Sequence, residues 1–83
     1  MLLDTYKIMH VIIAKLDQIL YDGEAQSLTV PGSAGEMTVL GHHEPLITTL
    51  KPGVITVRAG GEQTFPVQSG ILEVRPEGAT VIL

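Results

Sequence analysis

The chain has 83 residues, of which 45% are hydrophobic and 17% charged, and its formal net charge is −4. A chain this short forms a single domain with a thin core, and its apolar content argues against a disordered protein. Because a negative chain without a basic patch repels phosphate backbones, and because cysteine is absent, the composition argues against nucleic-acid binding, disulfides and thiolate chemistry.

The first twenty residues fit either of two structures. Apolar residues recur with helical spacing at Met9, Ile13, Leu16 and Leu20. Against this, Val11-Ile12-Ile13 is a run of branched side chains with restricted rotamers, which favours a strand. We predict a strand here.

The same region lacks the features of a membrane or targeting segment. Lys7, His10 and Lys15 interrupt the apolar residues, so no run reaches the ~18 residues of a membrane span. Asp4 stands where a signal peptide carries positive charge. Nothing in these residues predicts direct insertion into a membrane.

Two turns are predicted next. The stretch "YDGE", Tyr21–Glu24, places Asp-Gly between apolar segments, which is a hairpin signal because glycine tolerates positive φ. The stretch "VPGSAGE" then ends the following strand, since Pro31 removes a backbone donor and Gly32 and Gly35 permit the reversal.

Six short apolar segments follow, separated by stretches that contain glycine, proline or both. They read "MTVL", "LITTL", "VITVR", "TFPV", "ILEVR" and "TVIL". Within "ILEVR", the apolar Leu72 and Val74 alternate with charged residues, which is the period of a half-buried strand. Pro66 cannot donate to a ladder and predicts an edge strand or a bulge. Short strands at this spacing predict one all-β domain over residues 1–83, either a sandwich or a barrel.

His42, His43 and Glu44 raise the question of a metal site. Adjacent residues on a strand point to opposite faces, so the two histidines would converge only in a turn. His10 is the only other histidine and has no spacing relation to them, whereas a structural zinc site usually needs four ligands. We favour a surface turn and expect no metal and no other cofactor.

No nucleophile stands in a catalytic motif. Serines occur only at positions 27, 33 and 69, none of them in a Gly-x-Ser-x-Gly turn. Asp17 with Asp22, or Glu36 with Glu44, would offer two carboxylates for acid–base work, but solvated loop acids fit the spacing equally well. The residues alone indicate an interaction module.

The chain from roughly Val11 to Leu83 resembles the N-terminal β-sandwich domain of the epsilon subunit of F-type ATP synthases. The resemblance is carried in order by Tyr21-Asp22-Gly23, Pro31-Gly32, Gly35-Glu36, His43–Leu46, Pro52-Gly53 and "GILEV" at Gly70–Val74. Thr38 and Gly41-His42 depart from the family pattern, which bears on the shape of one turn. The family usually continues into a C-terminal helical hairpin, whereas this sequence stops at the last strand, as either a short-form subunit or a fragment would. The inhibitory and ATP-sensing roles of the hairpin are therefore not carried over.

The resemblance implies a fold and a function. The expected fold is a flattened sandwich of about ten strands in two sheets. Such a domain sits in the rotating central stalk, where it links the gamma subunit to the membrane ring of c subunits and couples proton translocation to ATP synthesis. It would catalyse nothing itself and would contact the membrane only through the complex. The absence of a transit peptide favours a bacterial enzyme, peripheral on the cytoplasmic side of the inner membrane.

The resemblance also implies two sets of site residues. Gly35, Glu36 and Met37 match the loop that faces the c ring, where a carboxylate and an adaptable thioether suit docking on polar loops. The set that matches the gamma-facing segment comprises Lys15, His43, Leu46, Ile47 and Thr48. An exposed apolar patch of several hundred Å² is expected on such a docking domain.

Other interpretations of these residues stay open. Leu46 and Ile47 fit core packing equally well, Glu36 fits a solvated loop acid, and His43 fits a turn residue that caps backbone groups. The main rival for the whole chain is a free-standing β-sandwich that binds a small ligand, although one Phe and two Tyr offer few stacking surfaces for a sugar. A small hydrolase would need a cleft with convergent titratable groups.

Overall fold

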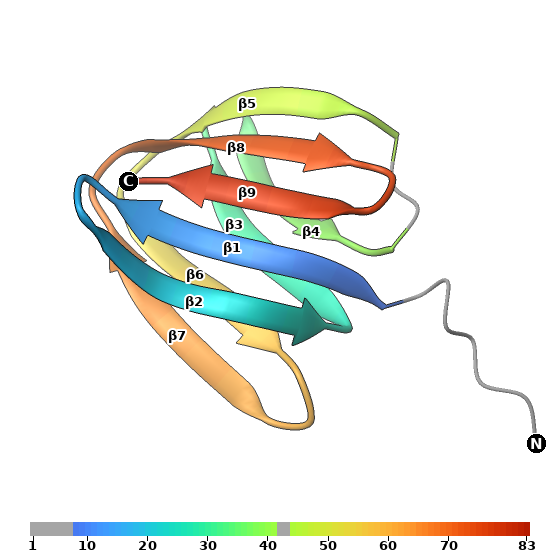
Figure 1. Cartoon of the computed structure of the whole chain (residues 1–83). Coiled ribbons are helices and arrows are strands. Elements are labelled where there is room, and N and C mark those ends of the chain that lie inside the picture. Colours follow the sequence, from blue (N-terminus) through green and yellow to red (C-terminus); the bar gives the residue numbers. More distant parts are fainter. Residues whose placement is uncertain (1–7, 42–43) are drawn as a thin grey trace, which may run out of the picture.

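The computed structural model describes residues 8–41 and 44–83, which form nine strands and no helix (Figure 1). The strands are β1 (Met9–Lys15), β2 (Gln18–Ala25), β3 (Ser27–Gly32), β4 (Gly35–Val39), β5 (Leu46–Leu50), β6 (Gly53–Arg58), β7 (Glu62–Val67), β8 (Gly70–Arg75) and β9 (Gly78–Ile82). The strand predicted over Val11-Ile12-Ile13 and the six later strands are confirmed, and the helical alternative is not adopted. Within the described ranges no helix is long and apolar enough to cross a membrane.

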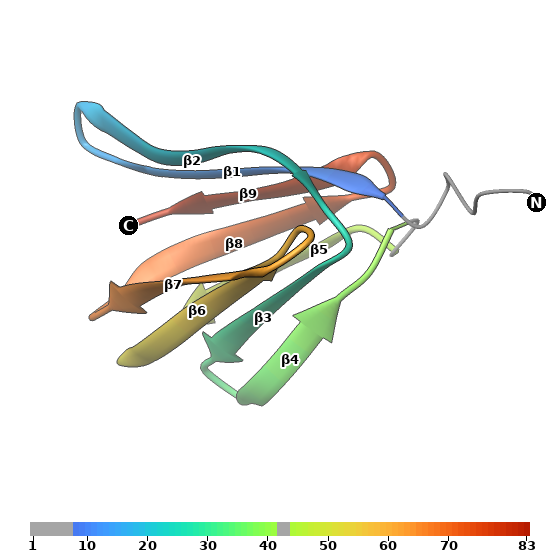
Figure 2. The ribbon, with the colours of Figure 1, turned by 90° about the horizontal axis from the view of Figure 1, so that it is seen from below.

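The strands form one continuously hydrogen-bonded sheet that curls over on itself. Their order is β2-β1-β9-β8-β5-β3-β6-β7, with β4 paired to the other side of β3. Seen from below, β2, β1, β9 and β8 make one layer, and β3, β4, β6 and β7 make the other (Figure 2). β5 joins the layers, since it pairs along its length with β8 but only through Leu50 and Gly32 with β3. The predicted all-β sandwich is confirmed, but its two layers belong to one hydrogen-bonded sheet of the nine described strands and not to the two separate sheets expected.

The first and last strands lie side by side. β1 pairs in parallel with β9, from His10 opposite Gly78 to Ala14 opposite Ile82. The backbone approach is close at Gly78, where an added Cβ would lie 2.2 Å from the His10 carbonyl oxygen. Only glycine fits this position without a shift of the backbone.

The sheet does not close between its two outermost strands, β2 and β7. In place of a backbone ladder, the rings of Tyr21 and Phe65 meet edge to face, with centroids 6.1 Å apart. This geometry is the favoured one for an aromatic pair and adds to the apolar contact across the gap. Pro66 lies in β7, which confirms the prediction of an edge strand.

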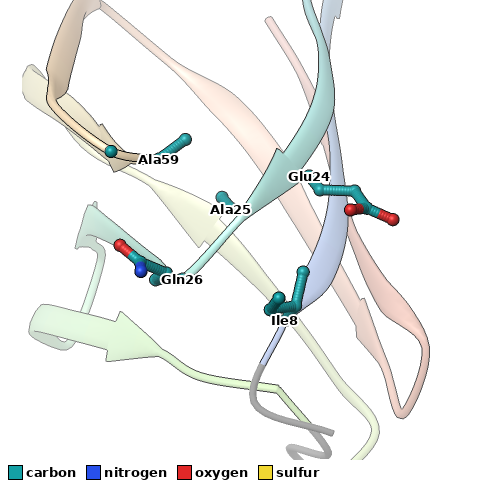
Figure 3. Close-up of a pocket in the computed structure, with 6 residues that line it drawn as sticks. Ile8, Glu24, Ala25, Gln26 and Ala59 are labelled. Carbon is teal, nitrogen blue, oxygen red and sulfur yellow. The ribbon is translucent and has the colours of Figure 1, made fainter. Parts of the chain in front are cut away.

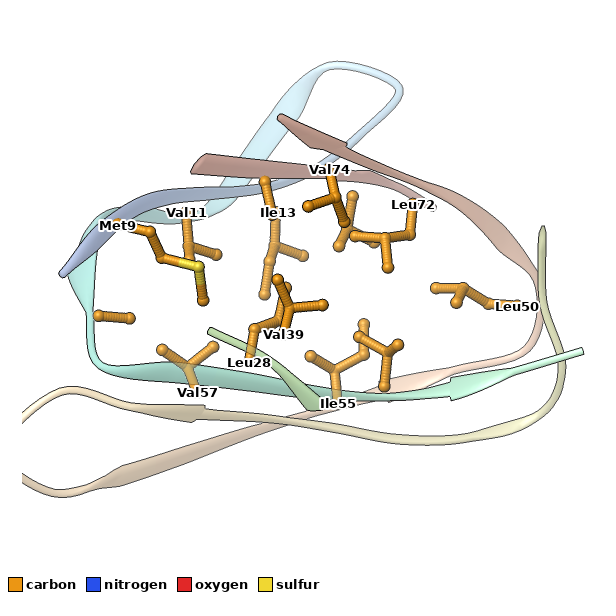
Figure 4. Close-up of a cluster of buried hydrophobic side chains, with 14 of the residues drawn as sticks. Met9, Val11, Ile13, Leu28, Val39, Leu50, Ile55, Val57, Leu72 and Val74 are labelled. Atoms are coloured by element: carbon orange, nitrogen blue, oxygen red, sulfur yellow. The ribbon is translucent and has the colours of Figure 1, made fainter. Parts of the chain in front are cut away.

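Alternating aliphatic side chains fill the space between the layers (Figure 4). Among the described residues, no polar or charged side chain is buried. The largest fully buried side chains are Ile13, Leu28, Ile55, Leu72, Val11, Val30, Val39, Val57, Val74 and Val81. Each contributes roughly 1.5–3 kcal/mol by leaving water, which explains how a chain with few aromatic residues can hold a core.

The prediction of a turn at Tyr21–Glu24 is wrong. These residues lie inside β2, and the hairpin turns at Leu16 and Asp17 instead. Gly23 does not form a turn. The Tyr21 ring lies over it, and the ring Cζ would be 3.6 Å from an added Cβ. The Tyr21 hydroxyl then donates to the Glu24 carbonyl at 3.0 Å. A ring that covers a strand glycine restores the packing that the glycine lacks.

The second predicted reversal is confirmed. β3 ends at Gly32, the chain turns at Ser33 and Ala34, and β4 begins at Gly35 with φ of 136°. That φ lies in the region that favours glycine. An added Cβ on Gly32 would lie 2.8 Å from the Gly35 carbonyl oxygen, so the tight turn needs both glycines.

Candidate interaction surfaces

One outer face of the sandwich carries a row of exposed isoleucines. Ala14 pairs with Ile19 of β2 on one side and with Ile82 of β9 on the other, and Ile82 pairs in turn with Ile71 of β8. Four adjacent strands thus contribute one apolar residue each, over roughly 14 Å at normal strand spacing. Ile47 of β5 is exposed on the same face, two residues along the strand from Thr49, which pairs with Ile71. We call Ile19, Ile47, Ile71 and Ile82 the isoleucine face; their exposed fractions are 62%, 71%, 50% and 51%.

A bulge in the first hairpin places Ile19 in this row. Ile13 pairs with Tyr21 and Ala14 pairs with Ile19, so Leu20 is the extra residue on β2. Leu20 packs against the core while Ile19 is exposed, as expected when a bulge changes the phase of a strand. The exposed side chain at position 19 is therefore a consequence of the bulge.

Exposed ion pairs border the isoleucine face. The Arg75 guanidinium donates to Glu73 at 2.9 Å through Nη1 and to Glu77 at 3.2 Å through Nε. His10 Nε2 lies 2.6 Å from Asp22 Oδ1, within hydrogen-bonding distance. Such exposed pairs add little to stability. An apolar centre with a polar rim is instead the usual composition of a protein interface.

The residues predicted to face gamma do not share one side of the sheet. Along β5, Ile47 is exposed on the outer face, whereas Leu46 and Thr48 are half-buried, and Leu46 packs against the core. Lys15 is exposed at the end of β1 and forms no ion pair with any described residue. His43 lies outside the residues that the structure describes. Only Ile47 of this set belongs to the isoleucine face.

Leu46 and Ile47 should therefore respond differently to the same change. Leu46→Asp is expected to lower the free energy of unfolding by about 2–4 kcal/mol, because it puts a carboxylate against the core. Ile47→Asp is expected to change it by less than about 0.5 kcal/mol. Urea unfolding followed by circular dichroism measures both, and equal losses would show that this assignment of the two faces is wrong.

The residues predicted to face the c ring lie on the other layer, at the β3–β4 hairpin. Glu36 is exposed and forms no ion pair within the described ranges, while Met37 is half-buried against the core. The hairpin is held in place because the Ser33 amide donates to the Thr49 carbonyl at 2.9 Å and the two hydroxyls lie 2.6 Å apart. The Glu36 carboxylate is thus presented on a turn that is fixed to β5 through Thr49.

One hollow of the described surface has a single titratable residue in its lining. A shallow hollow of about 200 Å³ lies beside the end of β2 (Figure 3). Glu24 is the only titratable residue that lines it, and its carboxylate points away from Ala25 and Ala59. Within residues 8–41 and 44–83, no three metal-binding side chains come together. His42 and His43, which raised the question of a metal site, lie outside these ranges.

These features define the class of small β-sandwich domains with an exposed apolar face. The sequence matches the family of the ATP synthase Delta/Epsilon chain beta-sandwich domain over residues 8–83. The chain belongs to this family.

Curated relatives are named as epsilon chains of ATP synthase. The chain is 41% identical to that of Mesorhizobium japonicum over 68 residues, which covers 80% of this chain and 50% of the relative. It is 42% identical to that of Bordetella petrii over 76 residues, with 89% and 54% covered. The chain thus spans about half the length of these relatives.

Solved structures share the fold. A chain in the mitochondrial ATP synthase of Euglena gracilis, determined as an OSCP/F1/c-ring assembly, superposes with a TM-score of 0.84 at 21% identity, over 92% of this chain and 50% of that one. A chain from the central stalk and c-ring structure of the Tetrahymena thermophila mitochondrial enzyme gives a TM-score of 0.74 at 14% identity, over 89% and 61%.

Proposed function

We propose that this domain is a rotor component of an F-type ATP synthase, joining the gamma subunit to the ring of c subunits. The observation that carries the proposal is the isoleucine face, an ordered row of apolar side chains on a domain of the epsilon family. Large contiguous apolar patches on soluble domains mark sites where a partner binds.

The two predicted contact sites support a linking role. Gamma would cover the isoleucine face, with Ile47 in the covered area and Lys15 beside it. Glu36 would meet the c ring from the opposite layer, held by the hairpin that Ser33 ties to Thr49. Because the sites lie on different layers, one domain can hold both partners at once.

The mechanism is mechanical coupling. Proton passage would turn the c ring, and a domain fixed to both the ring and gamma would carry the torque to the catalytic subunits. A sheet that is hydrogen-bonded continuously from one layer to the other suits this role, because strain at one contact is distributed over all its strands. The domain would supply attachment and leave the chemistry to other subunits.

We infer a bacterial location, peripheral on the cytoplasmic side of the inner membrane. Support comes from relatives such as those of Mesorhizobium japonicum and Bordetella petrii, which are about two-fifths identical.

Glu36→Arg is expected to weaken attachment to the c ring about tenfold and to lower proton-driven ATP synthesis in membrane vesicles, because it reverses the charge on the presented turn. The fold should be unaffected, since Glu36 is exposed and unpaired among the described residues. Binding of the purified domain to isolated c rings measures the first effect.

Glu62→Arg on β7 is the matched control. It makes the same change of charge on the same layer and breaks only an exposed pair with Arg58, at 2.8 Å. Equal effects of the two variants on ring binding would refute a specific role for Glu36.

A further inference from the structure

A cleft of about 480 Å³ opens at the end of the sandwich, where β1 ends and β7 turns into β8. We call it the end cleft. Its apolar wall is formed by Leu20, Phe65 and Leu83, all half-buried and packed against the core, together with the buried Val67. The cleft is separate from the isoleucine face, because the wall residues Leu20 and Leu83 pack inward while their neighbours Ile19 and Ile82 are exposed. Its volume lies within the ~300–1,000 Å³ of small-molecule sites.

Three polar side chains complete the cleft. Lys15 comes from the end of β1, and Gln68 and Ser69 come from the turn between β7 and β8. In the part of the chain that the structure describes, none of the three has a hydrogen bond or ion pair from its side chain. One ammonium, one hydroxyl and one amide are thus available beside an apolar wall.

We propose that the end cleft binds an aliphatic monocarboxylate. The carboxylate is held by the Lys15 ammonium and by donors on Gln68 and Ser69, and the hydrocarbon chain lies against Leu20, Phe65 and Leu83. Lys15 is the only charged side chain among the residues that line the cleft, and one cation favours a monoanion. Charge-assisted hydrogen bonds at one end and apolar burial at the other are the two attractions such a ligand needs.

The test is a titration of the isotope-labelled chain with octanoate, followed by backbone amide NMR. We expect saturable shifts centred on Lys15, Phe65 and Ser69. Hexanoate, which is two methylenes shorter, should bind about tenfold more weakly. Octanol and octylammonium test the head group, and both should bind more weakly than octanoate.

Lys15→Met keeps most of the side-chain stem and removes the charge, and it should weaken octanoate binding about fivefold while leaving octanol binding unchanged. Ile71→Ser is the matched control on the isoleucine face and should leave octanoate binding unchanged. A chain extended by two glycines is titrated in parallel. The extension moves the terminal carboxylate away from Leu83, which lines the cleft.

Saturable binding by either form of the chain, lost in part with Lys15→Met, supports the proposal. Shifts confined to the surroundings of Ile71 and Ile82, equal affinity of Lys15→Met, or no saturable shift in either form would overturn it. Lys15 belongs both to this cleft and to the predicted gamma contact, but the titration uses the domain without gamma, so none of its outcomes depends on whether the domain binds gamma.

Discussion

Ile71→Asp is expected to weaken binding of the gamma subunit by about 30-fold or more, which corresponds to roughly 2 kcal/mol. Ile71 lies inside the isoleucine face, with Ile82 directly opposite on β9 and Thr49 opposite on β5. A carboxylate there would be buried without a partner when gamma covers the face. Calorimetric titration of the purified domain with gamma from one of the bacterial relatives measures the change.

Val54→Asp is the control for this experiment. Val54 lies on β6 in the other layer and is 53% exposed, close to the 50% of Ile71. It should leave gamma binding within about twofold of the original chain. If Val54→Asp weakens binding as much as Ile71→Asp does, or if neither weakens it, gamma does not dock on the isoleucine face.

Gly78→Ala is expected to lower the free energy of unfolding by about 3 kcal/mol or more. The added methyl group would lie 2.2 Å from the carbonyl oxygen of His10, which is a backbone atom that cannot swing away. The β1–β9 ladder would have to open locally, and that ladder holds the first hairpin to the rest of the sheet. Urea unfolding of the purified chain measures the loss.

Gly61→Ala provides the comparison at an exposed turn. Nothing lies within 4 Å of an added Cβ at this position. The change should be neutral or should stabilise the chain by up to about 1 kcal/mol, since alanine has less freedom than glycine in the unfolded state. Similar losses for both glycine variants would mean that the close approach at His10 does not limit this fold.

The local sequence pattern predicted most of the strands, because the features it depends on involve only neighbouring residues. The alternation of Leu72 and Val74 with charged neighbours needs only the period of a strand, and Pro66 needs only its missing donor. The first hairpin was harder to predict. Asp22-Gly23 carries a turn signal, but pairing with β1 and the covering ring of Tyr21 outweigh it, and neither can be read from the local sequence.

The isoleucine face could not be found from the sequence alone. Ile19, Ile71 and Ile82 become neighbours only through the parallel pairing of β1 with β9 and through the bulge at Leu20. Part of the predicted site could have been refined, however. Strand geometry already separates Ile47 from Leu46 and Thr48, since adjacent residues face opposite sides. The family resemblance supplied the gamma-facing residues as one set, whereas the alternation of side chains along a strand would have assigned Ile47 to one face and Leu46 and Thr48 to the other.

The parallel pairing of β1 with β9 has a consequence for synthesis on the ribosome. β1 emerges early, yet one of its two ladders needs a strand that is made more than sixty residues later, as His10 opposite Gly78 shows. Until then the nascent polypeptide can hold only partial hairpins, with apolar side chains open to water. Contacts so distant along the chain also slow folding. The domain should therefore acquire protease resistance only after its last strand has left the exit tunnel.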